Sequence, residues 1–585
     1  MRRTLLCAPL LLLAGLPAQD PILLQAVLHP VTQAAETVRS MPASLKGVAV
    51  TADGAHWGLV YKHDGGSTTS DPLPVQDASR SLLLFVSRNG GQSWTQVSKM
   101  RTTGSIYGSL AVDPDGYTLH AAWYAWNGNV VSTSLVTSIY YSTYDTRTGL
   151  WAGAQDDVLV QGTSSNLAYS WPDIAVTPKG VVGVSFGCSR GTPAGWVGPN
   201  PGSSWLNGFL WKVKGGTWSA PHQVTLDGSG SYTSLQSFGE EFHMCYRCTT
   251  GGYGVAYRRF DAAAQQFGPE GELPVVPNPS NPAKNISNLY ANNNSHVALF
   301  PNGDVCVVYF TGTSASAGGK HMYVVAPAGT HVFGAPIQID DDPKMGWGNS
   351  AYWCHGVTRH GQNLALVYSL VNETYQNLYM RTLTQTGPLP AYGLPPVTLR
   401  QGTAANQFYH VNGFRELSQA HAGYVTYSDL VPVGPFTGGR ATFAGGPAGT
   451  AVWKGVGCQG TLATAPRLFA SALPAIGGTV SLGLAGLPAS TAGFLFLGFN
   501  DKTFGGLPLP LDLALLGMPG CPLSQDVLFG FGYAADASGA AAQVLPVPND
   551  PALAGLPAFW QSFVAAPGAT PGGMVLTNGL STVLR

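Results

Sequence analysis

Short apolar segments alternate with polar turns over the first 445 residues of the chain. Seven units share one pattern: an apolar strand, a polar turn that usually contains glycine, and an alternating strand that ends on an aromatic residue. Alternation with a period of two predicts strands with one buried face. The units read GVAVTADGAHWGLVY, SLAVDPDGYTLHAAWY, DIAVTPKGVVGVSF, TSLQSFGEEFHMCY, HVALFPNGDVCVVYF, HGVTRHGQNLALVYS and FRELSQAHAGYVTYS.

The closing aromatic residues recur at a spacing of roughly 60 residues, which indicates a repeat architecture. A second hairpin follows most units, as in LLLFVSRNGGQSW and SIYYSTYDTRTGLW, so each repeat supplies four strands. A single four-stranded sheet cannot bury both faces, whereas sheets packed radially can. The closing aromatic residues are Tyr61, Tyr124, Phe186, Tyr246, Tyr309, Tyr368 and Tyr427.

We therefore predict an all-β fold in which residues 19–445 form a β-propeller. Seven blades are expected, with six as the alternative because the last repeat is the weakest. The segment PILLQAVLHPV near the N-terminus is a candidate for the strand that closes the ring.

The composition changes beyond residue 446, where Ala, Gly, Leu and Pro dominate and charge almost disappears. Runs such as GTVSLGLAGL and VLFGFGYAA predict the short strands of a β-sandwich over residues 446–585. Cys458 and Cys521 are placed to pair within it. Either a carbohydrate-binding or surface-attachment module or a purely structural appendage fits this segment.

The N-terminal residues MRRTLLCAPLLLLAGLPAQD combine a basic start, an apolar run and small residues, which predicts a secretory signal peptide over residues 1–18. We expect a secreted or cell-surface monomer without a transmembrane segment. Charged residues make up 10% of the chain and the net charge is -1, so no basic field is available to hold nucleic acid.

Two further motifs are weak. Cys245 and Cys248 have CxxC spacing but lie in a strand-like run without a second CxxC, which disfavours zinc. Cys188 and Cys248 fall at matching places in neighbouring repeats, so they are either an inter-blade disulfide or two buried thiols. The loop expected at Asp340–Asp342 offers oxygen ligands for a structural calcium ion, although a solvated loop is the simpler reading. No other cofactor is expected.

The turn SRNGGQSW resembles the Asp-box (BNR) turn of sialidase-like propellers, Ser-x-Asp-x-Gly-x-Thr-Trp. Ser87, Gly91 and Trp94 match the motif, while Asn89 replaces Asp and Ser93 replaces Thr. The segments NNNSHVALFPNGDVCVVY and AYWCHGVTRHGQNLALVY are similar to strand pairs of BNR-4-type propellers, some of which are polysaccharide lyases. The resemblance covers only the propeller.

The resemblance implies a polarity: the innermost strands start at the functional face, and the Asp-box turn lies on the opposite rim. Mapped onto the repeats, this face collects histidine, aromatic and arginine residues, which suit sugar rings and carboxylates. We interpret His296 and His355 as base or orienting residues and Tyr352 as an acid. The expected substrate-binding residues are Arg190, Arg247, Trp171, Asp173, Tyr107, Tyr232, His410, Asn412 and His63.

Three functions remain open at this point. A lyase for uronate-containing polysaccharide would use the histidines and Tyr352 for β-elimination, with Arg247 or Arg190 neutralising the carboxylate. A non-catalytic propeller that binds glycan or protein needs none of these roles. A divergent exo-sialidase is disfavoured because the family's Arg-Ile-Pro motif is absent, and Glu240 and Glu241 fall in a turn on the wrong side.

Overall fold

The computed structural model describes most of the chain between Val27 and Leu584. The described residues are 27–30, 38–39, 47–62, 81–88, 95–100, 105–126, 137–162, 168–189, 193–198, 205–225, 230–248, 254–269, 271–273, 277–278, 281–285, 295–312, 319–342, 355–360, 363–369, 378–389, 391, 397–400, 407–412, 425–430, 439–445, 450–454, 457–462, 465–472 and 474–584.

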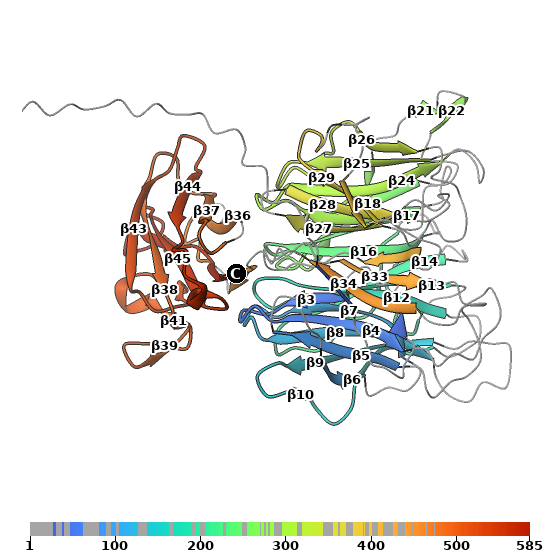
Figure 1. The fold of residues 1–585 in the computed structure, drawn as a ribbon, viewed down its shortest axis with the longest axis horizontal. Helices are drawn as coiled ribbons and strands as arrows, with labels where there is room; N and C mark the ends of the chain where they lie inside the picture. Colours follow the sequence, from blue (N-terminus) through green and yellow to red (C-terminus); the bar gives the residue numbers. More distant parts are fainter. Residues whose placement is uncertain are drawn as a thin grey trace, which may run out of the picture.

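Seven antiparallel sheets form a β-propeller, which confirms the seven-bladed prediction (Figure 1). The first three blades are, from the innermost strand outward: blade 1, β2 (Val38–Arg39) with β3 (Val48–Val50), β4 (His56–Lys62), β5 (Ser81–Ser87) and β6 (Thr95–Lys99); blade 2, β7 (Ser105–Val112), β8 (Thr118–Trp126), β9 (Thr137–Asp145), and β10 (Leu150–Trp151) with β11 (Asp157–Val160); blade 3, β12 (Ala168–Val176), β13 (Val182–Ser189), β14 (Trp205–Lys212) and β15 (His222–Gln223).

The remaining blades follow the same order: blade 4, β16 (Gly230–Phe238), β17 (Glu241–Cys248), β18 (Gly254–Asp261), and β19 (Gln266–Phe267) with β20 (Gly271–Glu272); blade 5, β23 (His296–Leu299), β24 (Val305–Gly312), β25 (Gly319–Ala326) and β26 (Ile337–Asp342); blade 6, β27 (His355–His360), β28 (Asn363–Ser369), β29 (Leu378–Leu383), and β30 (Pro388–Leu389) with β31 (Val397–Arg400); blade 7, β32 (Gln407–Asn412), β33 (Val425–Leu430), β34 (Gly439–Gly445) and β1 (Val27–Pro30). The hairpin β21 (Pro277–Asn278) and β22 (Asn281–Asn285) precedes blade 5.

The N-terminal strand closes the ring. β1 pairs antiparallel with β34, from Val27 opposite Gly445 to Pro30 opposite Thr442. The outermost strand of blade 7 therefore comes from the beginning of the chain, as the apolar segment PILLQAVLHPV predicts. Closure of this kind leaves only short sheet edges.

The recurring aromatic residues fill the space between blades. Tyr124, Phe186, Tyr246, Tyr309 and Tyr368 are all buried. Trp57 of blade 1 packs edge-on against Tyr144 of blade 2, with ring centroids 5.7 Å apart. Blades 1 to 6 thus bury their faces against one another, and the spacing of aromatic residues in the sequence is the spacing of blades.

Beyond the propeller, two sheets pack face to face as a β-sandwich. One contains, in spatial order, β35 (Thr450–Lys454), β47 (Gly579–Val583), β45 (Pro557–Ala565), β38 (Ala492–Gly498) and β43 (Phe529–Ala534), with β46 (Met574–Leu576) on β45; the other contains β36 (Arg467–Ala472), β37 (Thr479–Ala485) and β44 (Ala541–Pro546). Small elements complete it: β39 (Thr503–Phe504), β40 (Leu507–Pro508), β41 (Leu511–Asp512), β42 (Pro522–Leu523) and the 3₁₀ helices η3 (Leu513–Leu516) and η4 (Pro551–Leu553).

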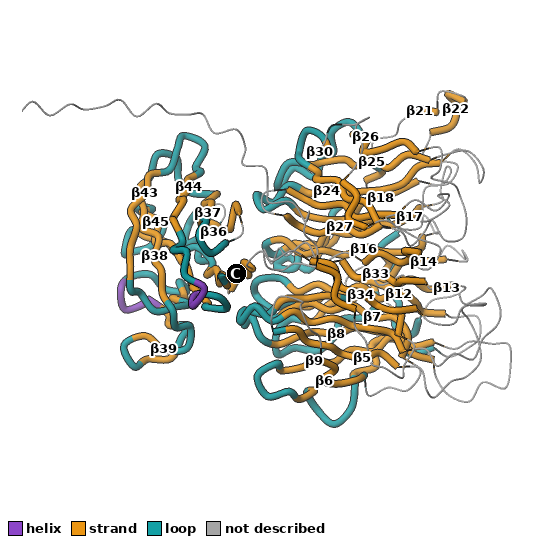
Figure 2. The backbone as a smooth tube through the Cα atoms, viewed as in Figure 1, coloured by secondary structure: helices purple, strands orange, loops and turns teal. Residues whose placement is uncertain are grey.

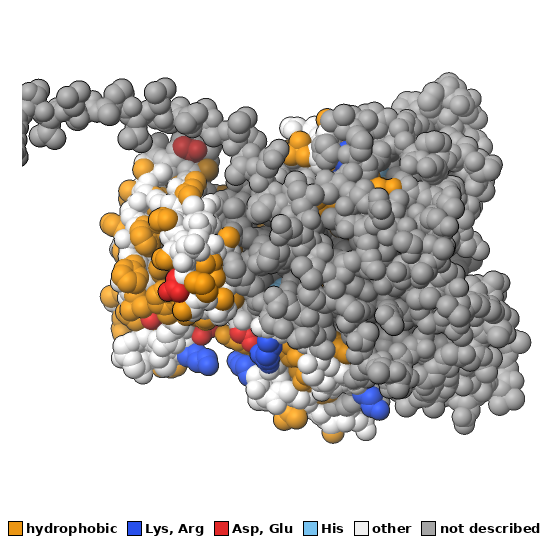
Figure 3. Space-filling view, in the orientation of Figure 1, with side chains coloured by type: hydrophobic (Ala, Val, Ile, Leu, Met, Phe, Trp, Pro, Cys, Tyr) orange, Lys and Arg blue, Asp and Glu red, His pale blue; other side chains and the backbone are white. Residues whose placement is uncertain are grey.

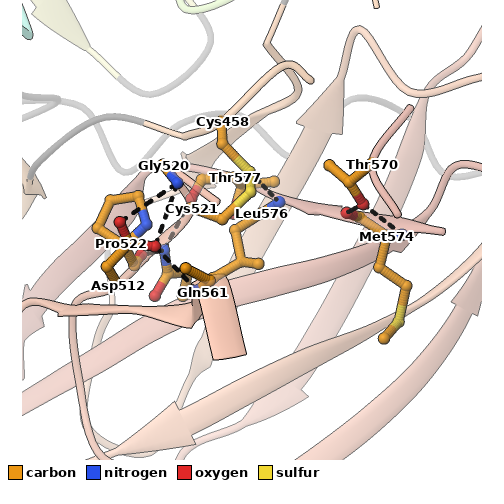
Figure 4. The surroundings of a disulfide bond; sticks show 11 residues. Cys458, Asp512, Gly520, Cys521, Pro522, Gln561, Thr570, Met574, Leu576 and Thr577 are labelled. Atoms are coloured by element: carbon orange, nitrogen blue, oxygen red, sulfur yellow. Dashed lines mark hydrogen bonds between the residues drawn. A yellow bond between two sulfur atoms is a disulfide. The ribbon is translucent and has the colours of Figure 1, made fainter. Parts of the chain in front are cut away.

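A disulfide bond joins Cys458 to Cys521 inside the sandwich core, as the sequence predicts (Figure 4). Gln561 braces the same region: its amide donates to the carbonyl oxygens of Pro522 and Thr577, both at 2.9 Å. The outer face of the sandwich is strongly apolar, with Phe494 and Phe529 more than half exposed, and Figure 3 shows hydrophobic atoms spread across it.

The sandwich contacts one end of the propeller, where the turns between first and second strands lie (Figure 2). Ser581 Oγ donates to the carbonyl oxygen of Ala52 at 2.7 Å, and the Tyr117 hydroxyl donates to Asp501 at 3.1 Å. The Arg467 guanidinium lies 4.5 Å from the centroid of the Phe238 ring and donates to the carbonyl oxygen of Asn302. We call this the turn end, and the opposite end, where the inner strands begin, the strand-start end.

Two expectations require correction. Cys188 is a buried thiol whose Sγ donates to the Leu206 carbonyl oxygen, so the disulfide to Cys248 does not form. Asp340–Asp342 end strand β26, with backbones opposite Gly319, Lys320 and His321, because the strand continues past the apolar residues. They are not the loop expected for calcium, and their side chains lie outside the described residues. In the described part of the chain, no helix is long and apolar enough to cross a membrane.

Candidate functional site

The topology gathers the backbones of several predicted site residues at the strand-start end. His296 and His355 are the first residues of β23 and β27, and Tyr107 and Tyr232 are each the third residue of β7 and β16. Trp171 lies in the first half of β12. Arg247 is near the end of β17, where its backbone pairs with Ser231, so it reaches the same end. His410 and Asn412 lie in β32, the inner strand of blade 7.

Most of these side chains lie outside the described residues, so their predicted roles stay predictions. Tyr352, His63 and Arg190 lie outside them altogether, as does most of the Asp-box-like turn. For His355, Arg247, Trp171, Tyr107, Tyr232, His410 and Asn412 only the backbone is described.

Asp173, one of the predicted substrate-binding residues, belongs to a ladder of hydrogen bonds between blades. The Ser109 hydroxyl in blade 2 accepts from the backbone N–H of Ile174 in blade 3 at 2.9 Å. Asp173 Oδ2 in blade 3 accepts from Leu235 N–H in blade 4 at 2.7 Å, and Ser234 Oγ in blade 4 accepts from Val297 N–H in blade 5 at 3.2 Å. In blades 2, 3 and 4, a polar side chain of the inner strand thus holds the next blade.

His296 occupies the next position in this series. Each N–H donor directly follows one residue of its own inner strand: Ile174 follows Asp173, Leu235 follows Ser234, and Val297 follows His296. Asp173, Ser234 and His296 therefore occupy equivalent positions in blades 3, 4 and 5. Asp173 and His296 are 5% and 2% exposed. Both side chains are therefore buried in the propeller, beside the hydrogen bonds that join neighbouring blades.

The acidic pair on the β16–β17 hairpin lies at the turn end, as the sequence indicates. Glu240 accepts hydrogen bonds from the Thr177 hydroxyl and from the backbone N–H of Lys179, both at 3.0 Å, and so connects blade 4 to the β12–β13 turn. Burial raises the pKa of Glu240, while these hydrogen bonds oppose the rise. The second residue, Glu241, belongs to a different cluster.

Glu241, His243 and His331 form the group of possible metal ligands that the described residues contain, with their ligand atoms within 4.8 Å of one another. Oε2 of Glu241 lies 3.5 Å from Nε2 of His331 and 3.9 Å from Nε2 of His243, while Oε1 accepts from Arg259. The Tyr257 hydroxyl lies 2.6 Å from Nδ1 of His243 and 3.3 Å from Nδ1 of His331. The cluster spans the seam between blades 4 and 5.

The local fold explains why these side chains meet. Glu241 and His243 are two apart on β17, so they share one face of the sheet. Tyr257 lies on the neighbouring strand β18, opposite Cys245. His331 arrives from the β25–β26 turn of blade 5 with φ of 55°, a left-handed conformation that histidine adopts more readily than most residues.

The electrostatic environment fixes the charges in this cluster. Burial lowers the pKa of His243 to about 4, despite the opposing charge of Glu241. Burial alone would raise the pKa of Glu241, but His331, His243 and Arg259 outweigh it and lower the value to about 2. At neutral pH the cluster therefore holds a neutral buried imidazole facing a carboxylate.

This cluster is absent from the sequence-based predictions. The i, i+2 spacing of Glu241 and His243 on one strand was the available signal. His331 is distant in sequence, in PAGTHVF, and only the packing of blade 5 against blade 4 brings it near.

No protein-family model and no curated protein matches the chain. Among solved structures, a protein of unknown function from Dyadobacter fermentans is 13% identical, covering 71% of this chain and 98% of that chain with a TM-score of 0.39. Penicillium chrysogenum alpha-L-arabinanase is 13% identical over 61% of this chain and 98% of its own, with a TM-score of 0.37. The polysaccharide lyase Uly1 is 11% identical over 69% and 89%, with a TM-score of 0.40. The fold assignment rests on strand pairing and not on these scores.

Proposed function

We propose that the protein is an exported, sialidase-like propeller that acts on an acidic, uronate-containing polysaccharide at the strand-start end. The observation that carries the proposal is the direction of the seven inner strands together with the location of the C-terminal sandwich. The contacts with the sandwich described above all fall at the turn end. None of these contacts lies at the strand-start end, which is therefore the propeller face that we assign to the polymer.

The residue types that recur toward that face support a lyase. β-Elimination at a uronate needs a base for the C5 proton, an acid for the leaving oxygen and a cation for the carboxylate. His355 and His296 supply the base and its orienting partner, Tyr352 supplies the acid, and Arg247 or Arg190 neutralises the carboxylate. These roles are hypotheses that follow from residue type and strand position.

The alternative is a propeller that binds glycan or protein without turnover. The buried environment of Asp173 and His296 favours this alternative, because both residues sit beside the inter-blade ladder. A sialidase is less well supported, because the acidic residues Glu240 and Glu241 make their contacts at the turn end.

Incubation of the purified full chain with a panel of acidic polysaccharides tests the proposal. Unsaturated products, followed by ultraviolet absorbance, indicate a lyase, whereas new reducing ends without unsaturation indicate a hydrolase. Binding in a glycan array without turnover indicates the non-catalytic alternative. The absence of both binding and turnover overturns the proposal.

Substitution at the strand-start end then tests the roles. His355→Ala and Tyr352→Phe are expected to abolish elimination. His222→Ala, on the outermost strand of blade 3, is the matched control and is expected to retain it. Full activity in His355→Ala and Tyr352→Phe would exclude the assigned roles.

A further inference from the structure

Blade 2 contains an arrangement that matches the histidine and tyrosine of the blade 4 cluster. His120 pairs across the sheet with Thr143, and Tyr141 lies two residues before Thr143. His243 pairs with Arg259, and Tyr257 lies two residues before Arg259. The Nδ1-to-hydroxyl distances are nearly the same, 2.7 Å in blade 2 and 2.6 Å in blade 4. The two blades therefore present the same His–Tyr pair in the same register.

In blade 2 the histidine belongs to a complete ion-pair network. Nε2 of His120 lies 3.1 Å from Oδ2 of Asp113, within hydrogen-bonding distance. Lys214, from the turn between the third and fourth strands of the neighbouring blade, donates to Oδ1 of Asp113 at 3.3 Å. The ammonium group and the imidazole satisfy the carboxylate from both sides.

In blade 4 the corresponding network is open. Nε2 of His243 is buried and, among the described residues, has no hydrogen-bond partner. It faces Oε2 of Glu241 across 3.9 Å. In blade 2 the neighbouring blade contributes Lys214 from the turn between its third and fourth strands. In blade 4 the equivalent turn of the neighbouring blade 5 contributes His331 instead. The ammonium group of Lys214 can only donate hydrogen bonds, whereas the imidazole of His331 also has a nitrogen lone pair that can bind a cation.

From this difference we propose that Nε2 of His243, Nε2 of His331 and Oε2 of Glu241 bind a divalent transition metal ion, Zn²⁺ in the first instance. Two imidazoles and one carboxylate are ligands that zinc accepts, and three protein ligands leave a fourth position. Bonds of about 2.0–2.2 Å in a tetrahedral site separate neighbouring ligand atoms by about 3.4 Å. The two separations from Oε2 of Glu241, 3.5 Å and 3.9 Å, lie close to this value. All three ligand atoms lie within 4.8 Å of one another, so the two imidazoles need to approach each other by at most about 1.4 Å on loading.

The surroundings of the three ligands suit a metal ion. A phenolic oxygen has two lone pairs, so Tyr257 can accept from Nδ1–H of both histidines and leave both Nε2 lone pairs directed at the site. Metal-ligating histidines are commonly oriented through the other ring nitrogen in this way. Arg259 pairs with Oε1 of Glu241 and leaves Oε2 for the metal.

The site is open enough to load. The side chain of Glu241 is 27% exposed and that of His331 is 16% exposed, whereas His243 lies beneath them. The metal would connect β17 of blade 4 to the β25–β26 turn of blade 5 at the turn end. It would lie at the opposite end from the proposed polysaccharide face, so it is independent of the proposed function.

Zinc titration of the full chain, after exchange into metal-free buffer, tests the proposal. We expect one Zn²⁺ per chain and a rise in the thermal midpoint on loading. His331→Ala changes a partly exposed turn residue and is expected to abolish stoichiometric binding. Tyr257→Phe is expected to lower the affinity about tenfold or more, because the histidines lose their orienting partner. His222→Ala is the matched control and should bind as the unaltered chain does.

Cobalt provides a second measurement. Co²⁺ bound to the proposed ligands should give visible absorption bands of tetrahedral intensity, which His331→Ala loses and His222→Ala keeps. Absence of saturable binding at one equivalent would overturn the proposal. So would an unchanged Zn²⁺ affinity in His331→Ala, since it would assign the binding to other residues.

Discussion

Oδ2 of Asp173 in blade 3 accepts a 2.7 Å hydrogen bond from the backbone N–H of Leu235 in blade 4. Both residues are buried, so removal of the carboxylate leaves a buried N–H without this acceptor. We expect Asp173→Ala to lower the free energy of unfolding by about 2 kcal/mol, measured by urea denaturation. Asp173→Asn keeps an acceptor and should lose less.

The same pair of variants tests the predicted role of Asp173 in substrate binding. If Asp173→Asn retains both stability and polysaccharide binding, the residue serves the inter-blade ladder. A selective loss of binding at unchanged stability would assign it to the site instead.

The network around Asp113 predicts acid sensitivity in blade 2. Burial by itself raises the pKa of Asp113, but the hydrogen bond and charge of His120, with the charge of Lys214, lower it from 3.8 to about 2. A depressed folded-state pKa contributes stability that is complete above about pH 4 and is lost as the pH falls toward 2. The contribution is about 2 kcal/mol.

Urea denaturation between pH 2 and 5 measures this contribution. Asp113→Asn should be less stable than the unaltered chain at pH 5, and the difference should shrink toward pH 2. A difference that stays constant over this range would contradict the assignment to Asp113.

The disulfide predicts a large effect of reduction on the sandwich. Cys458 and Cys521 are 63 residues apart in sequence, and closing a loop of this length restricts the unfolded chain. We expect the double variant Cys458→Ser/Cys521→Ser to lose about 4 kcal/mol in the sandwich transition. Trp560, buried in β45, is a suitable fluorescence reporter. Reductant should destabilise the unaltered chain but not the double variant.

Arg467 predicts coupling between the sandwich and the propeller. Its guanidinium covers the Phe238 ring and donates to Asn302, both in the propeller. We expect Arg467→Ala to separate the two modules' unfolding transitions in calorimetry, with a loss of about 1–2 kcal/mol of coupling. Arg258→Ala removes a comparable contact inside blade 4, where the Arg258 guanidinium lies 4.4 Å from the centroid of the Phe267 ring, and it should leave the coupling unchanged.

Much of the fold was predictable because it depends on local alternation and on repeat spacing. The buried aromatic residues Tyr124, Phe186 and Tyr246 mark the blades, and the N-terminal strand that completes blade 7 is visible as an apolar segment. Of the two alternatives for Cys188, the disulfide to Cys248 was wrong and the buried thiol is confirmed. Packing around Cys188 directs its Sγ to the Leu206 carbonyl oxygen.

The chemistry was harder to predict than the fold. His296 and Asp173 were predicted as site residues from their position in the repeat. In the structure, the inner strands also carry the inter-blade hydrogen bonds there, as Ser109 and Ser234 show, and the sequence gives no sign of these bonds. The cluster of Glu241, His243 and His331 joins two blades through a turn, and no spacing in one repeat encodes that contact.

The antiparallel pair β1–β34 has a consequence for the order of events during synthesis. Residues 27–30 are synthesised before the propeller blades, but their partners, residues 442–445, emerge only after six complete blades. The earliest strand must therefore wait without its partner while the rest of the ring is made.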